Sequence, residues 1–294
     1  MLEHLSPVEV KPSRVVVAGS AGFVGAAVAT RMEREGVEVV RLSRREVDFA
    51  ASDAASKLGM HLRAGDVFIA VAARAPCKDA DMLVENMHIA RAMVTALVSS
   101  APTHVINISS DAVYADSPGP LSEASCASPG SLHGAMHLAR EVMFAHQVKA
   151  PLAILRPSLL YGASDPHNGY GPNRFRRLAA KGEEIVLFGE GEERRDHVYI
   201  GDVAELAWRV VAHRSRGVLN IATGHVHSFR EIAGKVVELS GRAVEIRGSK
   251  RSGPMPHNGY RPFAIEGTLK AFPGFAYTDL DKGLAMAQGR TANG

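Results

Sequence analysis

The stretch from Arg14 to Gly25, RVVVAGSAGFVG, places three glycines at intervals of three directly after a run of β-branched residues. A run of this kind that ends in glycine is typical of a buried parallel strand. The apolar residues from Phe23 onward recur at helical spacing as far as Gly36, which predicts a helix. A strand, a glycine-rich turn and a helix start together predict a dinucleotide-binding loop.

Each glycine of this loop has its own expected role. Gly19 allows the tight turn, Gly22 lets the backbone approach a pyrophosphate, and Gly25 lets the helix pack against the strand. A plain tight turn is the alternative interpretation. The predicted cofactor contacts in the loop are Gly19, Ser20, Gly22, Phe23, Val24 and Gly25.

Strand-like and helix-like segments alternate along the first half of the chain. The expected strands are residues 14–19, 37–43, 66–73, 104–110 and 152–158. Such alternation implies right-handed βαβ crossovers, hence an α/β fold with a doubly wound, Rossmann-type parallel sheet. We expect residues 1–13 to be a tail and residues 14–160 to be the dinucleotide-binding domain. Some segments of 185–225 are expected to return to this domain, and 161–294 to form mainly a small C-terminal α/β substrate lobe.

Composition and charge narrow the function classes. The 294 residues carry a formal net charge of +3, too small and dispersed to favour nucleic-acid binding, whereas an anionic small ligand fits. Two cysteines, Cys77 and Cys126, make no disulfide framework and favour a reducing compartment. The chain shows neither a signal-peptide pattern nor a run of about 18 apolar residues. We therefore expect a cytoplasmic protein without a membrane partner.

The end of the second expected strand bears on the choice of cofactor. NAD-binding proteins usually place an acid there, but this chain has Ser43, Arg44 and Arg45. A hydroxyl and two guanidinium groups suit a 2′-phosphate, which favours NADP over NAD. Two solvated arginines are the alternative. Asp48 and Phe49 follow, where they border the adenine or serve as ordinary loop residues.

Several segments resemble the extended short-chain dehydrogenase/reductase family, the NAD-dependent epimerase/dehydratase group that acts on nucleotide sugars. They include VAGSAGFVG, AVAARA, NISSDAVYADS and LFGEGEERRDHVYIGDVAEL. The resemblance implies that Ala72 and Ala73 lie against the dinucleotide. It also implies that Ser110 hydrogen-bonds the reacting sugar oxygen, and that Asp111 stands where dehydratase-like members carry an acid.

The resemblance also assigns substrate contacts and a partner. Asn173, Arg195 and Arg261 fall near positions that hold the diphosphate in nucleotide-sugar members, with Arg195 the best aligned. His167 lies in the loop after Gly162 and is expected to face the substrate. Family members often dimerise through the helix of the catalytic pair and the long helix before it, so a homodimer is expected.

The catalytic pair itself departs from the family. The family helix carries Tyr-x-x-x-Lys, but this chain has His133 and His137 at those positions. Imidazole titrates near pH 6.5 without help from a lysine, so His133 is a candidate acid/base and His137 a candidate ribose contact. Imidazole is shorter than phenol, so the sugar must sit closer or a water must relay the proton.

Two other interpretations of the pair stay open. In one, the protein binds NAD(P) as a catalytically silent sensor or scaffold, and the histidines only fill space. In the other, His133, His137 and Glu141 form a metal site, because two histidines four apart on one helix face resemble a zinc helix. Gly134 stands where a zinc protease helix has its glutamate, so no metal is assigned.

Overall fold

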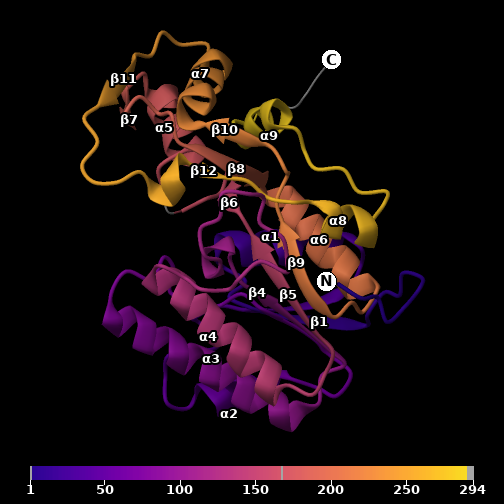
Figure 1. The fold of residues 1–294 in the computed structure, drawn as a ribbon. Helices are drawn as coiled ribbons and strands as arrows, with labels where there is room; N and C mark the ends of the chain where they lie inside the picture. Colours follow the sequence, from indigo (N-terminus) through magenta and orange to yellow (C-terminus); the bar gives the residue numbers. More distant parts are fainter. Residues whose placement is uncertain (1, 167, 290–294) are drawn as a thin grey trace.

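A six-stranded parallel sheet forms the centre of the computed structural model, which describes residues 2–166 and 168–289 (Figure 1). Its strand order is β2-β1-β3-β4-β5-β9. The strands are β1 (Arg14–Ala18), β2 (Glu38–Leu42), β3 (Val67–Ala70), β4 (His104–Ile108), β5 (Leu152–Pro157) and β9 (Gly217–Ile221). The order reverses between β1 and β3, and ligands of doubly wound sheets bind at such a reversal.

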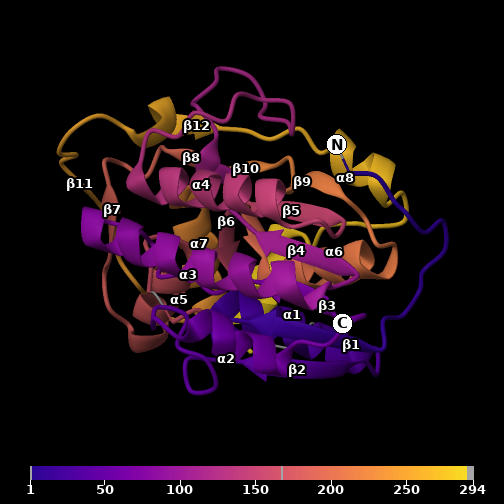
Figure 2. The same ribbon diagram turned by 90° about the horizontal axis from the view of Figure 1, so that it is seen from below.

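Side chains of β1 alternate between two apolar layers, as the two faces of a strand require. Val15 and Val17 pack with α1 and α6, whereas Val16 and Ala18 pack with α2, α3 and Phe144 of α4. The helices of these layers are α1 (Phe23–Arg34), α2 (Ala54–His61), α3 (Ala80–Ser100), α4 (Leu132–Gln147) and α6 (Ile200–Ala212). Figures 1 and 2 show α3 and α4 side by side on one face of the sheet. The expectation of a doubly wound α/β fold is confirmed.

A smaller lobe stands over the carboxyl edge of the sheet (Figure 1). Its strands β6, β10 and β12 all pair with β8, and β7 pairs with β11. The strands are β6 (Leu159–Tyr161), β7 (Ile185–Phe188), β8 (Arg194–Tyr199), β10 (Val226–Ser228), β11 (Ile246–Ser249) and β12 (Tyr260–Arg261). The helices of the lobe are α5 (Pro172–Lys181), α7 (Phe229–Ser240) and α9 (Leu280–Ala287), with the short 3₁₀ turn η2 (Pro256–Gly259). Tyr161, Phe175, Leu187 and Phe229 fill its core. The 3₁₀ turn η1 (Asp111–Val113), which follows β4, and α8 (Glu266–Ala271), which packs on β9, belong to the larger domain.

The chain crosses between the two parts more than once. After β8 it returns to the larger domain, where α6 packs on α1 and β9 pairs with β5. It then enters the lobe again through β10. The carboxyl ends of the parallel strands therefore face a lobe made from later parts of the chain.

The N-terminal segment, expected to be a tail, is bound along the domain. Glu3 and Arg216 exchange two backbone hydrogen bonds of 2.8 Å, and His4 lies between the Ser215 hydroxyl and the Ala271 carbonyl. Pairing of this kind leaves no periodic pattern, so the sequence did not reveal it. Within residues 2–166 and 168–289, helices are too short or too polar to span a bilayer.

Candidate functional site

One cavity of about 620 Å³ opens where the central strands end. Segments that follow β1, β2, β3, β4 and β5 line it, together with two side chains of α4. Of the predicted site residues, those that line it are Gly19, Gly22, Phe23, Val24, Ser43, Arg44, Asp48, Phe49, Ala72, Ala73, Ser110, Asp111, His133, His137 and Arg195. Ser20, Gly25, Arg45, Asn173 and Arg261 do not line it, and His167 is outside the described residues.

The glycine loop is shaped by close approach of backbones. Gly19 has φ +89°, and a Cβ there would lie 2.6 Å from the Ala72 nitrogen. A Cβ on Gly25 would lie 2.1 Å from the Gly19 oxygen. A side chain at position 25 would therefore displace the loop, although Gly25 itself does not line the cavity. Gly22 precedes α1, whose first turn contains no acidic side chain. The unpaired N–H groups of that turn therefore offer a site for a phosphate, which fits a dinucleotide.

The loop after β2 holds an acid that the sequence interpretation overlooked. The backbone N–H and the hydroxyl of Ser43 both donate to the Glu46 carboxylate, at 2.8 and 2.6 Å. The Ser43 hydroxyl bond, with the backbone bond, lowers the pKa of Glu46. Arg44 lines the cavity, whereas Arg45 is exposed outside it. The Ser-x-x-Glu spacing was a readable sign of this contact.

The start of α4 is pressed onto η1. Ser131 caps the helix by accepting a hydrogen bond from the Gly134 N–H at 3.1 Å. A Cβ on Gly134 would lie 2.0 Å from the Ala112 oxygen, so only glycine fits there without a shift. This contact brings His133 to the cavity wall beside Asp111.

The two histidines stand edge to face, with ring centroids 4.7 Å apart and planes at 86°. His133 Nδ1 accepts a long hydrogen bond of 3.4 Å from the Cys77 N–H. Burial lowers the pKa of His133, and the Asp111 carboxylate acts in the opposite direction. His137 is buried and its Nδ1 has no partner within the described chain. Burial, then the charges of His133 and Arg140, hold the pKa of His137 well below its ordinary value.

Glu141 faces away from this pair, toward the sheet. Its carboxylate accepts from the Ser109 hydroxyl at 2.5 Å and from Arg156 at 2.9 and 2.6 Å. Arg156 also donates to the Tyr114 hydroxyl, at 2.8 Å. Glu141 thus anchors α4 and does not join the histidines around a metal. Over the part of the chain that the structure describes, no group of three or more His, Cys, Asp or Glu could hold a metal ion.

Charged side chains on the lobe side of the cavity are paired with one another. Arg261 donates through Nε to Asp111 at 3.1 Å and through a terminal nitrogen to Asp116 at 2.7 Å. Arg195 lies 3.9 Å from the same Asp111 carboxylate. His257 reaches Asp116 at 2.5 Å, across 141 residues of sequence. Sequence reasoning missed Asp116 and His257, because no spacing indicates so distant a contact.

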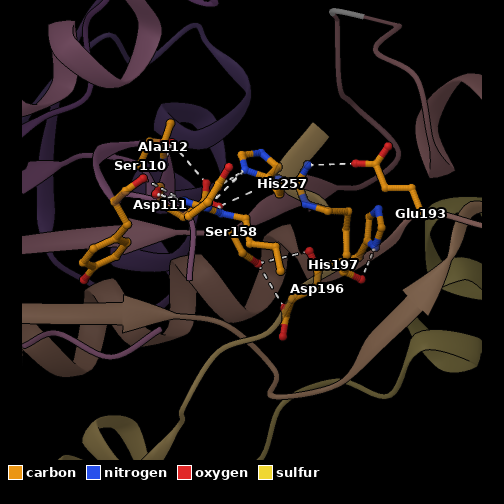
Figure 3. Close-up of polar contacts among 12 residues, drawn as sticks. Ser110, Asp111, Ala112, Ser158, Glu193, Asp196, His197 and His257 are labelled. Carbon is orange, nitrogen blue, oxygen red and sulfur yellow. Dashed lines mark hydrogen bonds and ion pairs between the residues drawn. The ribbon is translucent and has the colours of Figure 1, made fainter. Parts of the chain in front are cut away.

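Figure 3 shows how this group bridges the two parts of the molecule. Ser110, Asp111 and Ala112 lie on the side of the central sheet, and Glu193 and His197 lie on the lobe. Ser110 Oγ accepts from the Ala112 N–H at 3.2 Å and lies 3.4 Å from the Asp111 carboxylate. Its hydroxyl is thus oriented at the floor of the cavity.

Two of the three predicted diphosphate contacts are engaged elsewhere. The Asn173 side chain accepts from the Gly162 N–H at 3.0 Å and donates to the Leu160 carbonyl at 3.3 Å, joining α5 to β6. Arg261 is buried among the acids and carbonyls of the η1 loop. Arg195 alone of the three lines the cavity.

The amino-acid sequence is similar to a known family and to a known sugar epimerase. The model of the family described as NAD dependent epimerase/dehydratase matches residues 15–222. ADP-L-glycero-D-manno-heptose-6-epimerase of Nitratidesulfovibrio vulgaris is 23% identical over 265 residues, covering 77% of this chain and 81% of that protein.

Two solved structures share the fold at low sequence identity. UDP-glucose 4-epimerase of Thermus thermophilus, in complex with NAD, superposes with a TM-score of 0.83 at 22% identity, covering 94% of this chain and 98% of that one. A GDP-L-fucose synthetase of Naegleria fowleri gives 0.82 at 16%, covering 98% and 95%. A further structure of the Naegleria protein is bound to NADP.

Proposed function

Because the chain belongs to the NAD-dependent epimerase/dehydratase family, we propose that it is an NAD(P)-dependent epimerase, dehydratase or reductase of nucleotide-linked sugars in which His133 moves the proton. The observation that carries this proposal is that the glycine loop, Ser110 and His133 line the same cavity. The ADP-heptose epimerase and the UDP-glucose epimerase support the substrate class.

Each residue has a definite task in this proposal. The α1 N-terminus binds the pyrophosphate, and the His137 ring, which lines the cavity, meets a ribose hydroxyl. When bound, NAD(P) supplies a hydride acceptor or donor. Ser110 orients the reacting oxygen by hydrogen bonding. His133 accepts the proton of the substrate hydroxyl as that O–H bond breaks. In the reverse step it returns the proton to the substrate oxygen.

NADP is the proposed cofactor. Arg44 on the cavity wall supports this choice, because a guanidinium makes charge-assisted bonds to a 2′-phosphate. Arg195 is the proposed contact for the substrate diphosphate. Asn173 and Arg261 would join it only after exchanging their present partners.

A homodimer and a cytoplasmic location complete the proposal. Apolar side chains are exposed along the paired helices α3 and α4: Val84, Val98, Leu132 and Val142. Burial of these side chains against a second copy would stabilise a dimer.

A silent NAD(P)-binding protein is the second candidate, and the contact between His133 and Cys77 favours it. If Nδ1 accepts the Cys77 N–H, the proton of the neutral ring lies on Nε2. The lone pair that a base needs is then engaged by the protein backbone.

Turnover separates the two candidates. We expect purified protein to bind NADPH and to convert a member of a nucleotide-sugar panel. His133→Ala should lower kcat by about 10²- to 10⁴-fold while NADPH binding is retained. If the protein binds NADPH but turns over no member of the panel, and His133→Ala behaves like the unmodified protein, the enzyme proposal fails. The catalytically silent NAD(P)-binding protein would then be the remaining candidate.

A further inference from the structure

Arg140 is a buried cation whose bonds within the described chain all go to neutral oxygens. Its guanidinium donates to Asn107 Oδ1 at 2.6 Å and to the carbonyls of Ala72 and Ala70, both at 2.7 Å. It also lies over the Phe144 ring, 5.6 Å from the centroid. Burial lowers its pKa to about 10, so the group remains charged at pH 7.

A buried charge of this kind acts strongly on its neighbours. Removing a guanidinium from water is unfavourable, and no carboxylate among the described residues bonds Arg140 to offset that cost. The surrounding low dielectric that makes burial costly also weakens screening of the field of the charge. An apolar side chain could occupy the same space without this cost, so the charge itself points to a function.

Arg140 lies directly beneath the histidine pair. It follows His137 by three residues and His133 by seven, so the three side chains share one face of α4. Its bond to the Ala72 carbonyl also fixes the end of β3, where Ala72 lines the cavity. The Arg140 charge is therefore bonded to a segment that lines the same cavity as the two histidines.

The two histidines face different charges. His137 faces Arg140 and His133, and both of these oppose a positive charge on it. His133 faces the Asp111 carboxylate of η1 on one side and the Cys77 N–H on the other. Asp111 is the group that would stabilise an imidazolium at His133. Environments that separate two titratable groups in this way commonly divide the roles of a catalytic pair.

We propose that Arg140 is a positioning residue for the histidine pair: its charge adds to the burial of His137 in keeping that ring uncharged, and leaves His133, opposite Asp111, as the histidine that takes up the proton. The inference rests on the proposed function for its catalytic meaning. The electrostatic part concerns this chain alone and is measurable without any substrate.

Titration of labelled histidines by NMR tests the proposal on the intact protein. Signals of His133 and His137 are assigned from the His133→Gln and His137→Gln variants. In the unmodified protein, His133 should protonate at a higher pH than His137. Arg140→Met should raise the midpoint of His137 by about one pH unit or more, whereas Arg140→Lys, which keeps the charge, should leave it low. Arg242→Met, an exposed change in the lobe, is the control.

A second variant covers the case in which Arg140→Met does not fold. Asp111→Asn should lower the midpoint of His133 and leave that of His137 unchanged. The proposal is overturned if His137 protonates at a higher pH than His133, or if folded Arg140→Met titrates like the unmodified protein.

The outcomes also separate this proposal from the proposed function. Shifted titrations in a protein that turns over no nucleotide sugar would support the role of Arg140 and contradict the enzyme. Turnover that depends on His133, together with unmoved titrations in folded Arg140→Met, would contradict the role of Arg140 alone.

Discussion

The two halves of the cavity are built from different parts of the chain. On the cofactor side the backbone shapes the site, through the positive φ of Gly19 and the close approach of Gly25. On the substrate side, charged side chains hold one another, with Asp111 between Arg195 and Arg261. The first half is ready for an anion, whereas the second must exchange partners to bind one. Changes in the two halves should therefore have opposite kinds of effect.

The largest effect is expected at Gly25. In Gly25→Ala the new Cβ would lie 2.1 Å from the Gly19 oxygen, so the loop and α1 must move apart. We expect a loss of about 3 kcal/mol or more in unfolding free energy and roughly 100-fold weaker NADPH binding. Denaturant unfolding and calorimetry measure the two quantities.

Gly59→Ala is the matched control for this change. Gly59 lies inside α2, and a Cβ there meets nothing within 4 Å among the described residues. Alanine should stabilise the helix by about 0.5–1 kcal/mol and leave NADPH binding unchanged. If Gly25→Ala and Gly59→Ala lost equal amounts of unfolding free energy and of NADPH affinity, the glycine loop would not be a preformed binding site.

The next prediction concerns the ion pair between Glu141 of α4 and Arg156, which anchors α4 on the substrate side. Glu141→Gln leaves Arg156 buried without its carboxylate partner, which should cost about 3–5 kcal/mol in unfolding free energy. Because the hydrogen-bond partners of Glu141, Ser109 and Arg156, lie outside the glycine loop, the affinity for NADPH should change less than kcat. The double variant Glu141→Leu with Arg156→Met removes both charges and should recover most of the stability. No recovery would show that the pair acts through more than its charges.

A smaller and more selective effect is expected at Arg44. Arg44→Ala should weaken NADPH binding by about tenfold and leave NADH binding nearly unchanged, because only the former has the 2′-phosphate. Arg45→Ala, outside the cavity, is the control. If Arg44→Ala lost equal affinity for NADPH and NADH, Arg44 would contact the adenine or the ribose and not the 2′-phosphate. If Arg45→Ala weakened NADPH binding instead, the 2′-phosphate would be bound by Arg45.

The smallest effect, and the one of opposite sign, is expected at Asp116. Asp116→Asn removes a carboxylate from Arg261 and His257, so a diphosphate competes with less negative charge. Binding of UDP or ADP should tighten by about two- to fivefold, a range typical of partly exposed pairs. Glu245→Gln, a change at an exposed acid of the lobe outside the cavity, should leave this binding unchanged. Weaker binding in Asp116→Asn would mean that the paired arrangement itself binds the ligand.

The same contrast explains what the sequence could predict. Gly19, Gly22 and Gly25 lie within seven residues, and their spacing reports a local backbone geometry. Most of the strands were predictable for a similar reason, since β1, β3, β4 and β5 are short runs that are buried at nearly every residue. The fold and the family were therefore accessible, and both predictions are confirmed.

The substrate side depends on contacts between distant residues. His257 meets Asp116 across 141 residues, and Arg140 bonds carbonyls about 70 residues earlier. Nothing in the local pattern around Arg140 distinguishes a buried cation from a solvated one on a helix. The positions of His133 and His137 could be predicted from the resemblance, but the charges that differentiate them required the three-dimensional arrangement.

The pH dependence of kcat/KM for substrate oxidation tests the central role of His133 most directly. A base must be unprotonated, and burial lowers the pKa of His133, so activity should rise with pH through a midpoint below 6.5 and stay flat above neutrality. That rising limb should disappear in the residual activity of His133→Gln. A limb with its midpoint well above pH 7, or one that persists unchanged in His133→Gln, would contradict the account.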